Sequence, residues 1–270
     1  MSQPNRHHRI VVKVGTSTLT YSSGKLNLRC IERLARIISD LHNCGYELVL
    51  VSSGAIGVGA NKLGLRERPR TTRMKQAAAA VGQCELMHIY DKMFLEYGVT
   101  VAQILLTRSD VDSDHKRGNI HNTFDALLET GTVPIVNEND TVATEEIEAV
   151  ETFGDNDTLS AVVARLCGAD LLIILSDIEG LYDSDPRENP DARLISRVEH
   201  IDDDLRAVAG GPGTAGGTGG MATKLVAAEL CMDAGISMLI TRGDRPEILY
   251  DIVEGKPVGT RFISRKAEKE

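Results

Sequence analysis

The sequence predicts an α/β fold, an αβα sandwich in which a mainly parallel β-sheet lies between two layers of helices. Short apolar runs of strand length recur along the chain, and segments with a helical period separate them. Strands that are apolar throughout are typical of a parallel sheet covered on both faces. Ligands of such sheets bind at the carboxyl ends of the strands, so we expect the functional site there.

Six segments are predicted to be strands, with helices between them. The strands are residues 9–14, 47–51, 99–106, 133–137, 171–176 and 236–241. Apolar residues at positions i, i+3, i+4 and i+7 predict a helix around Ile31 to Leu41, with Asn27 and Gly45 as its caps. Further helices are predicted over residues 72–97, 158–167 and 221–234.

The composition excludes several classes of protein. The 270 residues are 42% hydrophobic, enough for a large core, and no apolar run approaches the roughly 20 residues of a membrane span. The net charge of −9 is spread along the chain without a basic stripe, so neither nucleic acid nor a membrane is an expected partner. The five cysteines form no CxxC pair, which favours a reducing cytoplasm and buried thiols.

The first predicted strand contains a lysine near its end, and small residues follow it. A charged side chain inside an apolar strand is costly unless it has a partner or a cavity. Lys13, Gly15, Thr16 and Ser17 would together offer a phosphate an ammonium group, free amides and hydroxyls. The alternative is a lysine on an edge strand without a ligand.

The second predicted strand ends in a small polar turn. Ser52, Ser53, Gly54 and Ala55 lie just before a predicted helix start near Ile56. The free amides at a helix N-terminus suit an anion such as a carboxylate or a phosphate. A serine-capped turn without a ligand is the alternative.

Two clusters of amides and carboxylates lie close together in the sequence. They are Asn137, Glu138, Asn139 and Asp140, followed by Gly154, Asp155, Asn156 and Asp157. Carboxylates of this kind can hold the ammonium group of an amino acid, while amide donors hold its carboxylates. Alternatively, Asp155 or Asp157 only caps the helix that follows.

A glycine-rich stretch precedes the last long helix. Residues 210–220 contain seven glycines, which would let the backbone approach a ligand closely. Lys224 in the first turn of the helix opposes the helix dipole, and a bound polyanion would explain this placement. Residues 211–216 fit GxGxxG but follow a helix-like segment instead of a strand, and no P-loop motif occurs, so neither common nucleotide fingerprint is present.

In order and spacing these motifs resemble the glutamate 5-kinases of the amino-acid kinase family, over residues 9–262. The pair of clusters at 137–140 and 154–157 is the most specific part of the match. The resemblance implies the amino-acid kinase fold over residues 9–265, with a glutamate-binding lobe at 9–168 and a nucleotide-binding lobe at 169–265. Residues 1–8 are then expected to be a loose N-terminus, and no C-terminal PUA domain is expected.

The resemblance also implies the reaction and the residues that carry it. The expected activity is phosphorylation of the side-chain carboxylate of L-glutamate by ATP and Mg²⁺, the first step of proline biosynthesis. Lys13 and Lys224 would flank the transferring phosphoryl group, and Asp157 would hold both lysines. The implied glutamate-binding residues are Ser53, Asn137, Asp140, Asp155 and Asn156. The implied ATP-binding residues are Lys13, Ser176, Asp177, Thr218, Gly219, Gly220, Met221, Ala222, Thr223 and Lys224.

The resemblance implies partners and leaves rivals open. No protein ligand is predicted for Mg²⁺, which we expect on ATP oxygens and water. Proline is an expected inhibitor near residues 75–83, and a dimer or tetramer and functional coupling to glutamate-5-semialdehyde dehydrogenase are implied. The alternatives are a kinase of N-acetylglutamate, aspartate, carbamate or a nucleoside monophosphate, or a non-catalytic sensor. Asp140 and Asn156 suit a free ammonium group, and two retained lysines argue against a sensor.

Overall fold

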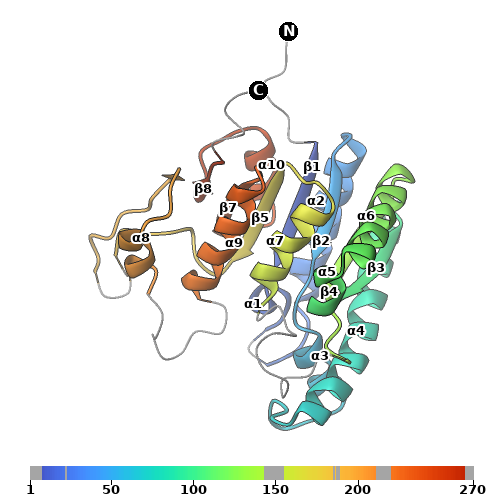
Figure 1. Cartoon of the computed structure of the whole chain (residues 1–270). Helices are drawn as coiled ribbons and strands as arrows, with labels where there is room; N and C mark the ends of the chain where they lie inside the picture. The colour runs from blue at the N-terminus through green and yellow to red at the C-terminus, as the bar shows by residue number, and fades with distance from the viewer. Residues whose placement is uncertain are drawn as a thin grey trace.

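A β-sheet covered by helices on both faces forms the centre of the molecule (Figure 1). The computed structural model describes residues 8–21, 23–142, 155–184, 186, 189–210 and 220–264. In this part of the chain the strands are β1 (Arg9–Val14), β2 (Glu47–Val51), β3 (Val101–Leu106), β4 (Val133–Glu138), β5 (Leu171–Ser176), β6 (Arg197–Val198), β7 (Ser237–Arg242) and β8 (Thr260–Phe262).

The sheet has the order β3-β4-β2-β1-β5-β7-β8-β6 in the described residues. Every pair from β3 to β7 is parallel, β8 is antiparallel to β7, and β6 runs parallel to β8. The predicted mainly parallel α/β sheet is therefore confirmed. The sequence did not reveal β6 and β8, because runs of two and three residues carry too little periodicity.

The helices lie mostly between consecutive strands. They are α1 (Thr16–Leu19), α2 (Leu28–Asn43), α3 (Ala55–Lys62), α4 (Thr72–Leu95), α5 (Arg108–Asp112), α6 (Asp114–Glu129), α7 (Asn156–Leu166), α8 (Asp203–Val208), α9 (Met221–Asp233) and α10 (Ile248–Val253). Asn27 caps α2 by accepting a hydrogen bond from the amide of Cys30, as predicted, and Gly45 follows α2 with φ of 93°. Helix α6 escaped prediction because it buries only Phe124 and Leu128.

Alternate residues of the central strands fill two hydrophobic cores. Val11 and Ile174 point to the face that α6, α7 and α9 cover. Val12 and Ile173 point to the opposite face, where α2, α3, α4 and α10 pack. This arrangement buries both faces of β1 and β5 and directs their carboxyl ends to the same edge of the sheet.

The cysteines differ in their exposure to solvent. Cys30, Cys167 and Cys231 are buried as expected, but Cys44 and Cys84 are exposed because they lie at a helix end and on an outer helix face. Among the described helices, none combines the length and the apolar character that a membrane crossing needs.

Candidate active site

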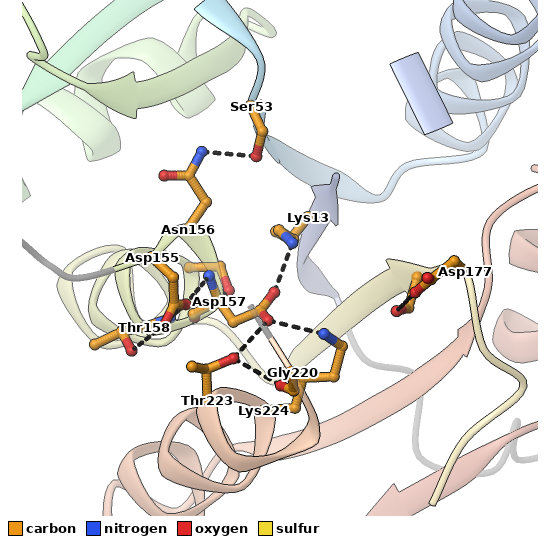
Figure 2. A network of polar contacts seen from close by, with 12 residues as sticks. Lys13, Ser53, Asp155, Asn156, Asp157, Thr158, Asp177, Gly220, Thr223 and Lys224 are labelled. Carbon is orange, nitrogen blue, oxygen red and sulfur yellow. Dashed lines mark hydrogen bonds and ion pairs between the residues drawn. The ribbon is translucent and has the colours of Figure 1, made fainter. Parts of the chain in front are cut away.

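Asp157 at the start of α7 lies between two lysines from distant parts of the chain (Figure 2). Its Oδ1 is 2.6 Å from Nζ of Lys13 on β1, and its Oδ2 is 3.0 Å from Nζ of Lys224 on α9. All three side chains are buried, with 1% of Asp157, 8% of Lys13 and 4% of Lys224 exposed. The three groups together carry one net positive charge at the end of the central strands.

The ionisation of Asp157 depends on these two lysines. Burial alone would raise the pKa of its carboxyl group. The charges of Lys13 and Lys224, with hydrogen bonds from both, outweigh burial and hold the pKa of Asp157 below its usual value. Asp157 therefore remains an anion at neutral pH, and each lysine keeps a counter-charge for its ammonium group.

The first turn of α9 brings Lys224 to this position. Thr223 Oγ1 lies 2.8 Å from the carbonyl oxygen of Gly220 and 3.3 Å from Asp157 Oδ2, so it can donate to either (Figure 2). Met221 packs against the core and Ala222 is exposed. The carboxylate of Asp157 explains how a lysine is tolerated in the first turn of a helix, where the dipole disfavours it. Thr218 and Gly219 lie outside the described residues.

A second polar cluster lies at the same edge of the sheet. Asn156 Nδ2 is 2.7 Å from Ser53 Oγ, 2.8 Å from the carbonyl oxygen of Ser52 and 3.1 Å from Asn137 Oδ1. These groups come from the ends of β2 and β4 and from the first residue of α7. Gly54, which follows Ser53, has φ of 93° and leads directly into the N-terminus of α3.

Asp155 caps α7 beside this cluster. Its Oδ1 accepts hydrogen bonds from the amides of Asp157 at 2.6 Å and Thr158 at 2.9 Å. Burial and the nearby charge of Asp157 raise the pKa of Asp155, although the two amides and Lys13 act in the other direction. The capping role considered from the sequence is therefore present, and the same carboxylate also lines the adjacent cavity.

A cavity of about 820 Å³ joins the two clusters. Predicted site residues on its wall are Lys13, Ser53, Asn137, Asp140, Asp155, Asn156, Asp157, Ser176, Asp177 and Lys224. Ser176 ends β5 and donates a hydrogen bond to Asp177 Oδ1 at 3.0 Å. Residues from six separate segments of sequence thus meet at the carboxyl edge of the sheet.

The cavity also has lining residues that the sequence did not reveal. Arg66, Glu67 and Arg68 lie in the connection between α3 and α4, and Asn61 lies near the end of α3. Their place on the wall depends on the path of this connection after α3, and no local motif marks it. Gly15, Thr16 and Ser17, proposed from the sequence as phosphate contacts, also line the cavity.

Comparison with known proteins places the chain in a family. The model of the amino acid kinase family matches residues 8–242. Glutamate 5-kinase of Clostridium perfringens is 56% identical over 260 residues, covering 96% of this chain and 97% of that protein. Glutamate 5-kinase of Clostridium tetani is 58% identical over 257 residues, covering 95% of each.

Solved structures with the same fold have distant sequences. Carbamate kinase from Giardia lamblia bound to AMP-PNP has a TM-score of 0.68 at 18% identity, covering 96% of this chain and 99% of that one. UMP kinase from Bacillus anthracis has a TM-score of 0.65 at 16% identity, covering 97% and 98%. These structures match the fold, while the close relatives match the sequence over nearly its whole length. The chain belongs to the glutamate 5-kinases of the amino acid kinase family.

Proposed function

We propose that this chain is an ATP-dependent kinase that phosphorylates the side-chain carboxylate of L-glutamate to L-glutamyl 5-phosphate, the first step of proline biosynthesis. The observation that carries the proposal is the pair of buried lysines on Asp157, at one end of a cavity whose wall also carries Ser53 and Asn156. The identity of 55–58% to glutamate 5-kinases supports glutamate as the acceptor.

The reaction needs positive charge more than it needs a base. A carboxylate oxygen is ionised at neutral pH, so it can attack a phosphoryl group without losing a proton. Its negative charge must approach the charged oxygens of the γ-phosphate, and the ammonium groups of Lys13 and Lys224 would reduce this repulsion. Asp157 keeps both lysines in place and stays ionised while it does so.

The second cluster would hold glutamate by its charged groups. Asp140 and Asp155 on the cavity wall would attract the ammonium group. Ser53 and the N-terminus of α3 would favour a carboxylate. Asn137 and Asn156 would complete the pocket with amide groups.

ATP would occupy the part of the cavity next to β5 and α9. Ser176, Asp177 and the start of α9 at Gly220 to Lys224 are the proposed contacts within the described residues. Mg²⁺ would supply charge neutralisation on the phosphate oxygens. We propose that ATP oxygens and water supply most of its ligands, because Mg²⁺ usually keeps several waters and binds through substrate phosphates.

Proline inhibition is a further part of the proposal. Proline shares an α-carboxylate and an ammonium group with glutamate, and residues 75–83 on α4 include Gln83, which contacts Asn137. We expect proline to raise the apparent KM for glutamate. A glutamate saturation curve that does not change with added proline would contradict the proposed inhibition by proline.

The test is ADP release from MgATP with L-glutamate, L-aspartate and N-acetylglutamate in parallel assays. We expect release with glutamate alone. Release of ADP with N-acetylglutamate or aspartate but not with glutamate would show that the chain is a kinase with another substrate. No release with any acid, from protein whose cooperative thermal unfolding shows that it is folded, would favour the sensor.

A further inference from the structure

Three amide side chains form a continuous line from helix α4 to the cavity. Asn137 Nδ2 donates to Gln83 Oε1 at 3.0 Å, and Asn156 Nδ2 donates to Asn137 Oδ1 at 3.1 Å. Gln83 is 9% exposed and Asn137 is 2% exposed, so these two amides are shielded from water, while Asn156 is partly buried at the cavity wall. Gln83 is not among the described residues that line the cavity.

The partners of Asn137 leave its amide one favourable orientation. Its Oδ1 accepts from the backbone amide of Glu138 at 2.9 Å as well as from Asn156. A flipped Asn137 would place its NH₂ group against both of these donors and its oxygen against the oxygen of Gln83. The Glu138 amide therefore sets the orientation of Asn137, and Gln83 Oε1 accepts the hydrogen bond that the Asn137 NH₂ group donates in this orientation.

The orientation of Asn137 in turn affects Asn156. The two hydrogens of Asn156 Nδ2 face three protein acceptors, which are Ser53 Oγ, the carbonyl oxygen of Ser52 and Asn137 Oδ1. The donor end of the Asn156 side chain is therefore used within the protein. The atom that Asn156 can offer to a ligand in the cavity is its carbonyl oxygen Oδ1, which is a hydrogen-bond acceptor.

We propose that Gln83 is a positioning residue that, through Asn137, holds Asn156 as an acceptor toward the cavity and so makes the site selective for a substrate with a free ammonium group. An ammonium group has three donors and no acceptor, so it needs acceptors around it. The inference rests on the proposed function, because it concerns the amino-acid end of the same site.

The packing of α4 against α3 explains how Gln83 reaches Asn137. A Cβ atom on Gly82 would lie 1.8 Å from the carbonyl oxygen of Ala55, and one on Gly59 would lie 1.7 Å from that of Ala78. Helices α3 and α4 thus approach each other closely at Gly59 and Gly82. Gln83 follows Gly82 in the chain and accepts a hydrogen bond from Asn137 at the end of β4. Gln83 and Tyr90, whose hydroxyl is 3.0 Å from Ser52 Oγ, are two buried polar contacts from α4 to this end of the site.

The test compares glutamate with glutarate, the same dicarboxylate without an ammonium group, using KM in turnover assays and Kd from calorimetry. Gln83→Met keeps the side-chain length and removes the acceptor. We expect KM and Kd for glutamate to rise roughly tenfold, those for glutarate to change less than about twofold, and kcat to stay within about twofold. Gln83→Glu keeps an acceptor for Asn137 Nδ2, so we expect it to retain the preference for glutamate.

Gln103→Met is the matched control, because Gln103 is exposed on β3. This variant should leave KM and Kd unchanged for both glutamate and glutarate. If thermal unfolding shows that Gln83→Met does not fold, Gln83→Asn tests the same contact. Its side chain is one methylene shorter, so its amide oxygen lies farther from Asn137. The inference would be overturned if the Gln83 variant bound glutamate and glutarate equally more weakly than wild type, or if it bound both as tightly as wild type does. Calorimetry requires no turnover, so an inactive wild type that still prefers glutamate would contradict the proposed function while leaving the inference testable.

Discussion

Lys13 and Lys224 lie near opposite ends of the chain, yet their ammonium groups are 2.6 Å and 3.0 Å from the two oxygens of one buried carboxylate, that of Asp157. Burying two cations and one anion is costly unless each has a partner. The arrangement keeps one net positive charge beside the cavity, where a transferring phosphoryl group would need it.

Removal of either ammonium group should slow turnover without preventing glutamate binding. We expect Lys13→Met and Lys224→Met each to lower kcat roughly 100-fold or more, as losing one oxyanion donor does in other enzymes. The KM for glutamate should change little, because both lysines lie at the phosphoryl end. Steady-state kinetics checks this, with Lys62→Met, an exposed lysine paired with Glu85, as the control. Wild-type turnover in either variant would exclude that lysine from the mechanism.

Neutralising Asp157 should destabilise the protein. Asp157→Asn leaves two buried lysines without their counter-charge, and breaking buried pairs of this kind costs about 3–5 kcal/mol of unfolding free energy. Urea unfolding at neutral pH measures the loss. Asp177→Asn, at an exposed position, should stay within about 0.5 kcal/mol of wild type. If both variants were equally stable, Asp157 would not hold the lysines against a desolvation cost.

Asp155 should show the opposite effect on stability. Its pKa is raised in the folded state, so its ionisation opposes folding, and the cost appears as pH rises through the pKa of the group. Asp155→Asn keeps a side chain that caps helices well. We expect the variant to have a higher Tm than wild type at pH 7, with the difference shrinking toward pH 3, and to bind glutamate more weakly. A Tm difference that does not depend on pH would contradict the raised pKa.

Two helical glycines should respond in opposite directions to the same substitution. Gly82→Ala must push α3 away from α4, because its Cβ would overlap the carbonyl oxygen of Ala55, and we expect a loss of about 1–3 kcal/mol or more. Gly118 on α6 has open space around it, so Gly118→Ala should gain about 0.5–1 kcal/mol. Urea unfolding of the two variants provides the comparison. Equal effects would mean that the close contact of α3 and α4 is absent in solution.

The sequence predicted the parts of the structure that short-range patterns specify. Apolar runs marked β1 and β5, and the amides and carboxylates after β4 drew attention to Asn137 and Asn156 before their contacts were known. The sequence also singled out Lys13 and Lys224 as charges in unfavourable local positions. In each case a local rule is broken, and tertiary contacts compensate for it.

The remaining features depend on contacts between distant segments. The antiparallel β8 has three residues, so its place beside β7 is set by pairing in the folded sheet and not by a pattern of its own. Arg66 and Arg68 reach the cavity because of the path that the chain takes after α3. Gln83 is a polar residue on a long helix, and its role becomes visible only when β4 brings Asn137 beside it.

The most direct test of the proposed reaction is to trap its product with hydroxylamine and identify it by mass spectrometry. With MgATP and L-glutamate, wild-type protein should give γ-glutamyl hydroxamate in an amount equal to the ADP released, and Lys13→Met should give almost none. ADP without hydroxamate, or hydroxamate from N-acetylglutamate or aspartate but not from glutamate, would contradict transfer of the phosphoryl group to the glutamate side chain.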